Sequence, residues 1–276
     1  MPGVAGVEPD FGREAEWVSS ALQAARLGHT ALLHLLLKKK LIQSEEYLAE
    51  LDELASDEFV HSVRRFVAQS ETQLRNARWH VGGTEATEQL GRRLALVPRD
   101  AALDIGCGIG GPARQIAETF GCTVAGVDHR LERIIEAMLR TSALGLNSRV
   151  SFHVADGEHL PFEDEVFDAV ISQATLDRIP NKMAVIRETY RVLKSEGRFG
   201  FECESLTEKG GDQTEQDSSQ PFRILAWQQV LAALGFIDIE VEEMWEESRR
   251  FYPTGPERDQ IDRGERVNVR ITARKP

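Results

Sequence analysis

The sequence has few cysteines and no long apolar run. Of its 276 residues three are cysteine, Cys107, Cys122 and Cys203, and no two of them form a C-x-x-C pair. An odd and scattered set of this kind gives no disulfide framework and is typical of a reducing cytoplasm. The N-terminus lacks a basic segment followed by an apolar stretch, so no secretory signal is expected. The leucine-rich stretch 32–37 is far too short to span a bilayer, and no membrane partner is expected.

Basic residues are fewer than acidic residues. The chain has 33 Lys and Arg against 45 Asp and Glu, which gives a net charge of −12. Such a field repels a long polyanion, so DNA and RNA are disfavoured as partners. A metal site is not expected either. His153, Asp156 and His159 are evenly spaced, but His153 lies in a predicted strand, His159 lies beyond a turn, and no cysteine joins them.

Glycine, in contrast, is concentrated in residues 103–111, which read Leu-Asp-Ile-Gly-Cys-Gly-Ile-Gly-Gly. The apolar start of this stretch predicts the end of a buried strand, and the glycines allow a tight turn close to a ligand. A helical pattern follows over 112–120, and then an apolar strand over 123–127 that ends at Asp128. Strand, glycine-rich turn, helix, strand and acid form half of a nucleotide-binding α/β unit, with the ligand at the carboxyl ends of the strands.

The glycine spacing alone leaves the ligand open. Gly106, Gly108 and Gly111 also satisfy the G-x-G-x-x-G fingerprint of dinucleotide-binding proteins. Asp104 separates the two interpretations, because a pyrophosphate binds a bare helix N-terminus and a carboxylate beside that loop opposes it. A ligand with an α-amino group and a sulfonium gains from the same carboxylate. The loop therefore favours S-adenosylmethionine over NAD.

The chain divides into two predicted domains. Residues 1–75 are expected to form an N-terminal all-helical cap, because apolar residues recur there at helical spacing. Its leucines at 32–37 need a partner surface, and a lid over the site or a homodimer interface would supply one. In residues 76–276 strands and helices alternate, which predicts an α/β domain whose sheet is mostly parallel, with helices on both faces.

The stretch 103–111, together with Asp128 and Asp156, resembles the class I S-adenosylmethionine-dependent methyltransferases, and the resemblance runs over about 81–275. The branch it resembles methylates small molecules: sarcosine and phosphoethanolamine N-methyltransferases, and sterol and tocopherol C-methyltransferases. The fold that this implies is a Rossmann-like seven-stranded sheet with its last strand antiparallel. The segments that carry the branch resemblance are 82–87, 104–114, 172–173, 179–182 and 188–194.

The resemblance and side-chain chemistry together give the expected cofactor contacts. Asp104 would orient the methionine ammonium, Asp128 would accept both ribose hydroxyls, and Asp156 would take the adenine amine. Gln173 is expected at the methionine part, and Trp79 would close over the same end. An Asx turn is the structural alternative for Asp156. The other expected contacts come from neighbouring loop residues: Gly106, Cys107, Gly108, Gly110, His129, Gly157 and Glu158.

The acceptor side is less well defined. Members of the family often carry a histidine pair in the loop after the fourth strand, whereas residues 176–179 here read Leu-Asp-Arg-Ile. Because a sulfonium is already an activated donor, much of the catalysis can be positioning in a water-poor pocket. An amine acceptor needs only to be neutral, but a hydroxyl or carbon nucleophile needs a base. Asp177, Glu202 and Tyr252 are the catalytic candidates, although each also has a structural explanation.

The sequence therefore predicts a cytoplasmic methyltransferase of specialised metabolism that acts on a small molecule. One alternative is an enzyme that binds the same cofactor and catalyses another reaction, such as a cyclisation. A second alternative is a non-catalytic scaffold whose working surface is the leucine-rich cap. The presence of Asp104, Asp128 and Asp156 speaks against a scaffold, because a scaffold needs none of them.

Overall fold

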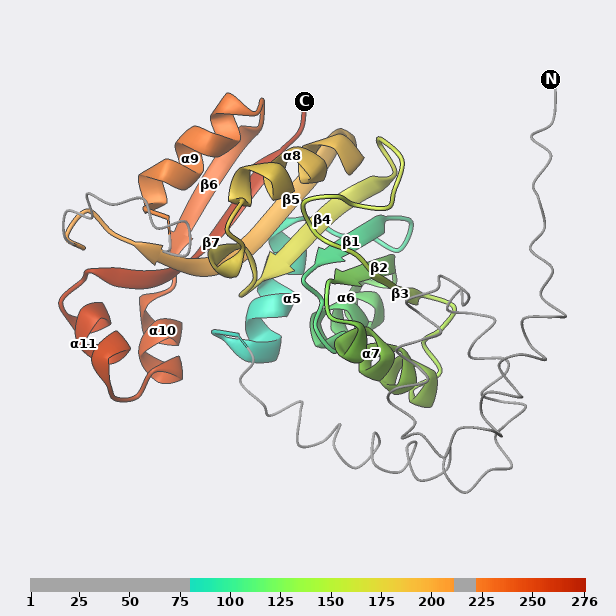
Figure 1. Ribbon diagram of the computed structural model, residues 1–276, viewed down its shortest axis with the longest axis horizontal. Coiled ribbons are helices and arrows are strands. Elements are labelled where there is room, and N and C mark those ends of the chain that lie inside the picture. The colour runs from blue at the N-terminus through green and yellow to red at the C-terminus, as the bar shows by residue number, and fades with distance from the viewer. Residues whose placement is uncertain (1–79, 211–221) are drawn as a thin grey trace, which may run out of the picture. The chain divides into compact units, whose positions relative to one another are not determined.

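The computed structural model describes residues 80–210 and 222–276, which form a sheet with helices packed around it (Figure 1). The helical cap predicted for residues 1–75 lies outside the described residues, and so does Trp79. In the part of the chain that the structure describes, no helix is long and apolar enough to cross a membrane.

Strands and helices alternate along the described chain, as the sequence predicts. The strands are β1 (Ala101–Ile105), β2 (Thr123–Asp128), β3 (Val150–Val154), β4 (Phe167–Gln173), β5 (Leu193–Leu206), β6 (Ile237–Glu243) and β7 (Arg266–Arg274). The helices are α5 (Gly83–Arg93), α6 (Gly111–Phe120), α7 (Leu131–Ala143), the short 3₁₀ turn η2 (Leu176–Arg178), α8 (Lys182–Val192), α9 (Ile224–Ala233), α10 (Trp245–Phe251) and α11 (Pro256–Asp262).

The seven strands form one sheet in the order β3-β2-β1-β4-β5-β7-β6. All neighbouring pairs from β3 to β5 are parallel, whereas β7 runs antiparallel to both β5 and β6. This confirms the predicted Rossmann-like sheet with its last strand antiparallel. Chain order reverses between β1 and β4, and the carboxyl ends of these two strands flank a crevice of the kind in which open α/β sheets bind ligands.

The two faces of the sheet are covered by different helices, with α5, α6 and α7 on one side and α8 and α9 on the other (Figure 1). Successive residues of β5 face opposite sides of the sheet and contact different helices. A Cβ atom on Gly200 would lie 2.8 Å from Leu90 of α5, so α5 lies directly against the strand. On the opposite face Phe199 and Phe201 are fully buried and pack in one core with Trp227 of α9. Helices therefore cover both faces of the sheet.

Candidate active site

The glycine-rich turn after β1 is fixed to β2. The backbone amides of Gly106 and Cys107 both donate to the carbonyl of Val127, at 2.8 and 2.9 Å. Gly106 has a φ of 76°, and a Cβ there would lie 2.2 Å from the side chain of Thr175. Gly108 has a φ of 55° and open space where its Cβ would be. The turn thus needs glycine once for a close approach and once to leave room above the backbone.

Asp104 is the most unusual acid of the site. It lies on β1, is 1% exposed, and its Oδ2 is buried without a hydrogen-bond partner. Burial first, and then the nearby Asp128, raises the pKa of Asp104 to about 7, although a backbone hydrogen bond at Ala113 opposes the shift. An unsatisfied buried carboxylate oxygen is costly for a fold and calls for a partner. Asp104 therefore favours a cationic or hydrogen-bond-donating ligand.

Asp128 ends β2 and is held from several directions. Its Oδ2 accepts hydrogen bonds from the Gly108 amide at 3.1 Å and from the Arg133 guanidinium at 3.3 Å, and its Oδ1 accepts one from the Arg130 amide at 2.9 Å. The carboxylate is only 2% exposed, but Arg133 is 42% exposed, so the ion pair opens toward solvent. His129 is 3.7 Å away and largely exposed. Asp128 therefore fixes the glycine-rich turn to the end of β2.

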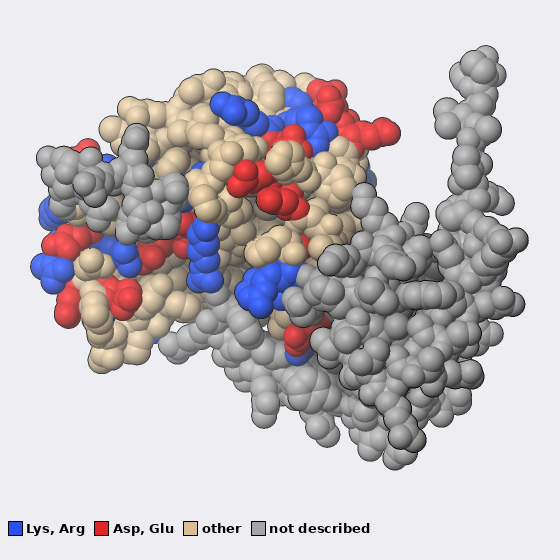
Figure 2. Space-filling model, viewed as in Figure 1, with Lys and Arg blue, Asp and Glu red and all other residues tan. Residues whose placement is uncertain are grey.

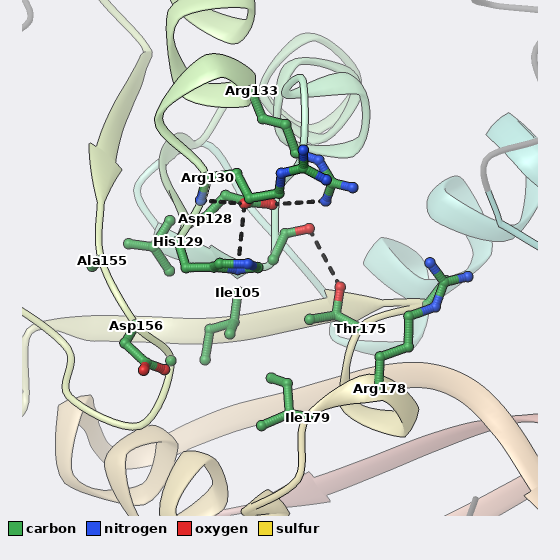
Figure 3. A pocket seen from close by; sticks show the side chains of 14 residues that line it. Ile105, Asp128, His129, Arg130, Arg133, Ala155, Asp156, Thr175, Arg178 and Ile179 are labelled. Carbon is green, nitrogen blue, oxygen red and sulfur yellow. Dashed lines mark hydrogen bonds and ion pairs between the residues drawn. The ribbon is translucent and has the colours of Figure 1, made fainter. Parts of the chain in front are cut away.

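A pocket of about 240 Å³ opens at the carboxyl ends of β1, β2, β3 and β4 (Figure 3). It brings together five of the predicted cofactor residues: Gly106, Asp128, His129, Asp156 and Gly157. Residues that were not predicted complete the lining: Ile105, Val127, Arg130, Arg133, Ala155, Ala174, Thr175, Arg178 and Ile179. The best available sequence signal for Arg178 was the departure of 176–179 from the family pattern.

The remaining predicted contacts lie behind or beside this pocket. Asp104, Cys107, Gly108, Gly110, Glu158 and Gln173 are not part of its lining. Gly110 packs so closely that a Cβ would lie 2.4 Å from Phe152, which is a structural reason for glycine there. Asp156 is exposed and accepts a hydrogen bond from the Glu158 amide at 3.0 Å, so it does form an Asx turn. Its second carboxylate oxygen has no such bond in the described chain.

Gln173 and Glu202 belong to a buried polar network. The Gln173 amide donates to Glu202 at 2.6 Å and its oxygen accepts a hydrogen bond from Thr87 of α5 at 2.9 Å. The other oxygen of Glu202 accepts a hydrogen bond from Arg270 of β7 at 2.6 Å, and Arg270 is 2% exposed. Arg270 also reaches Glu242 of β6 at 2.8 Å. These side chains therefore join α5 to four strands, and Glu202 is held as the partner of a buried cation.

The other two catalytic candidates lie in a second polar group, near the carboxyl ends of β4 and β5. Burial raises the pKa of Asp177, and its Oδ1 is buried without a hydrogen bond. Burial also raises the pKa of Glu204, which lies 3.2 Å from Arg266. The pKa of Tyr252 is raised by burial first and then by Glu204. Of the three predicted catalytic candidates, Asp177 directly precedes two residues that line the pocket, Arg178 and Ile179.

The geometry fits S-adenosylmethionine at three points. The unpartnered Oδ2 of Asp104 suits an ammonium group, and the open space above Gly108 admits a ligand close to the backbone. Asp128 and Asp156 present carboxylates at the ends of neighbouring strands, where hydroxyl and amine donors can be accepted. Among the described residues no three His, Cys, Asp or Glu side chains are grouped so as to hold a metal ion.

Comparison with known proteins gives the same assignment. Residues 103–201 match a family described as a methyltransferase domain. The methyltransferase GfsG of Streptomyces halstedii is 39% identical over 119 residues, which are 43% of each chain. Phosphoethanolamine N-methyltransferase 1 of Arabidopsis thaliana is 32% identical over 167 residues, 59% of this chain and 34% of the relative.

A solved structure of similar fold is phosphoethanolamine N-methyltransferase 2 of Haemonchus contortus with phosphomonomethylethanolamine and S-adenosylhomocysteine. It is 25% identical with a TM-score of 0.59, over 71% of this chain and 54% of that one. The two curated relatives are matched over less than half of their own length. The matched region nevertheless contains the glycine-rich turn, Asp104, Asp128 and Asp156. Residues 103–201 therefore match a methyltransferase domain, and the fold around them is similar to that of a solved methyltransferase with S-adenosylhomocysteine.

Proposed function

We propose that the protein transfers a methyl group from S-adenosylmethionine to a small-molecule acceptor. The observation that carries this proposal is the unpartnered, buried Oδ2 of Asp104 beside a glycine-rich turn. A fold with no use for that oxygen would gain stability by losing it. The three acids 104, 128 and 156 stand at the ends of adjacent strands, a placement that suits an ammonium, a ribose diol and an adenine amine in turn.

The protein's own residues would bind the cofactor, orient it and exclude water from the pocket. S-adenosylmethionine, when bound, supplies a methyl group activated on a sulfonium. Asp104 would hold the ammonium, and the apolar side chains of Ile105, Val127 and Ile179 would limit water in the pocket. For an acceptor that must lose a proton, Asp177 Oδ1 is the favoured recipient, because it is unpartnered and its carboxyl pKa is raised.

The N-terminal residues enter only as a proposal. We propose that residues 1–75 form a helical cap that covers the acceptor side or joins two copies of the chain. The support is the leucine-rich helical pattern of the sequence alone. Removal of residues 1–70 would lower acceptor affinity if they form a lid, whereas unchanged affinity would contradict it.

The proposal is tested first by calorimetry on the full chain with S-adenosylmethionine, S-adenosylhomocysteine and, as a control, NADH. Both adenosyl ligands should bind and NADH should not. Asp128→Ala should weaken their binding by about 1 to 3 kcal/mol, because it removes a buried charged acceptor. Asp164→Ala, which removes an exposed acid away from the pocket, should leave affinity unchanged.

The chemical step is tested with cofactor that carries a labelled methyl group and a small-metabolite extract. Label in a new small molecule supports methyl transfer. Cofactor binding without any transfer of label would favour a non-methylating reaction such as a cyclisation. No binding of either adenosyl ligand would contradict the proposal and leave the scaffold interpretation.

A further inference from the structure

The residues that line the pocket carry a net charge of the opposite sign to that of the whole chain. The protein carries a net charge of −12, yet three of the residues that line the pocket are arginine and two are aspartate. Asp128 is already matched by Arg133 and two backbone amides. Figure 2 shows two basic patches close together in the middle of the described part of this face. Counted over the residues that line the pocket, the charge that is left over is therefore positive.

Arg178 lines this pocket from a backbone segment that the fold holds in place. It ends the 3₁₀ turn η2, which is anchored by the buried Leu176. The Arg178 amide donates to the carbonyl of Thr175 at 3.0 Å, and Lys182 Nζ donates to the carbonyl of Ile179 at 2.9 Å. The backbone on both sides of Arg178 is thus tied down, and its side chain leaves a fixed point.

The guanidinium of Arg178 has no hydrogen bond or ion pair with another residue of the described chain. Several other partly exposed arginines of this domain are paired, for example Arg93 with Glu242 at 3.0 Å and Arg258 with Asp262 at 2.8 Å. A guanidinium offers five N–H donors in a planar fork that matches a carboxylate or phosphate. In the pocket, that fork is available to a ligand.

The position of Arg178 separates it from the adenosine end of the site. Figure 3 shows Asp156 and Arg178 on opposite sides of the pocket, with Thr175 beside Arg178. The Thr175 hydroxyl donates to the carbonyl of Gly106 at 3.4 Å, so Arg178 lies on the side of the glycine-rich turn. Asp104 is also on this side, because it lies two residues before Gly106 in the chain.

We propose that Arg178 receives an anionic group of the methyl acceptor, a phosphate or a carboxylate, and that the protein is specific for anionic small molecules. The inference rests on the proposed function. A sulfonium adds one more positive charge to the pocket, so a cationic acceptor would be repelled there and an anionic one attracted. The bidentate fork also fixes the orientation of the acceptor, which in-line transfer requires.

The test uses inorganic phosphate and acetate as probes, titrated into the full chain saturated with S-adenosylhomocysteine. At least one anion should bind wild type and bind Arg178→Gln at least tenfold more weakly. Arg178→Lys should restore part of the affinity, because it keeps the charge and loses the fork. The matched control is Arg187→Gln, on the exposed face of α8, which should bind like wild type. A preference for phosphate or for acetate identifies the anionic group.

The same variants are then assayed for label transfer with the metabolite extract, before and after phosphatase treatment. Arg178→Gln should lose transfer through a higher KM at nearly unchanged affinity for S-adenosylhomocysteine. If wild type binds the adenosyl ligand but neither anion, or if Arg178→Gln binds anions like wild type, the inference is overturned and the proposed function stands. If no adenosyl ligand binds at all, the proposed function itself fails.

Discussion

Two buried carboxylates of one sheet are treated in opposite ways. Asp104 on β1 is 1% exposed and leaves an oxygen without a hydrogen bond. Glu202 on β5 is 4% exposed, and both of its oxygens are taken, by Arg270 and by Gln173. Each residue lies in the second half of its strand, so its position along the strand does not explain the difference.

We interpret the difference as one between an acid kept for a ligand, as the proposed function requires, and an acid with a structural role. A buried charge that has its partner within the chain holds elements together, whereas one without a partner is kept at a cost to stability. Under the proposed function, the half of the sheet with β1, β2 and β3 would hold the unsatisfied carboxylate for a ligand. The half with β5, β6 and β7 uses its charges to join distant segments. Substitutions in each half of the sheet can test these two interpretations.

The largest effect is expected for Arg270→Met. This change leaves Glu202 buried without its cation and should lower the free energy of unfolding by about 3 to 5 kcal/mol, measured by urea denaturation. The double variant Glu202→Met with Arg270→Met should recover much of this loss, because no charge is then left unpaired. Arg92→Met removes an exposed ion pair and should barely change stability. Equal losses in the single and double variants would contradict a structural role for the pair.

A smaller effect of opposite sign is expected for Asp104→Asn. The pKa of Asp104 in the folded chain is about 7, above its ordinary value of 3.8. The fold therefore loses stability as the pH rises from about 4 to 7, where this acid must ionise while its Oδ2 has no hydrogen-bond partner. Asparagine removes that penalty, so at pH 8 the variant should be more stable than wild type by up to about 4 kcal/mol. A destabilised variant at pH 8 would mean that Asp104 has a partner.

The same residue predicts how cofactor affinity depends on pH. Only the carboxylate of Asp104 attracts an ammonium, so calorimetric affinity for S-adenosylmethionine should fall roughly tenfold from pH 8 to pH 6, with proton release on binding near pH 7. Asp104→Asn should bind more weakly at pH 8, by about 1.5 to 3 kcal/mol, and lose this pH dependence. An unchanged profile in the variant would assign the proton to another group.

The contrast also explains what the sequence could predict. The site around β1 and β2 is encoded within residues 103–128, because strand, turn, helix and acid follow one another directly. Val127 accepts both amides of the turn, and Asp104 pairs in register with Gly126, so local order becomes spatial order. The fold class, the glycine-rich turn and the acid at the end of β2 were therefore legible without coordinates.

The contacts around β4, β5 and β7 could not be predicted from the sequence, because they join residues far apart in the chain. The cofactor contact of Gln173 stays a prediction, whereas its hydrogen bonds with Thr87, 86 residues away, and with Glu202 were not predicted. Arg270 reaches Gln89 across 181 residues. No local pattern marks such pairs. The lining arginines were missed for a related reason, since an arginine in a loop reads as solvated until the pocket beside it is known.

The smallest effect is expected for substitution of Arg133, whose ion pair could be either structural or part of the ligand site. It pairs with the buried Asp128 at 3.3 Å but is 42% exposed itself. If Asp128 is held for a ligand, Arg133 competes with the ribose hydroxyls, and Arg133→Gln should raise cofactor affinity slightly, by less than about 1 kcal/mol. If the pair is structural, as Arg270 and Glu202 are, the same variant should lose both stability and affinity. Because an exposed partner leaves Asp128 two backbone donors, at Gly108 and Arg130, we expect the first outcome.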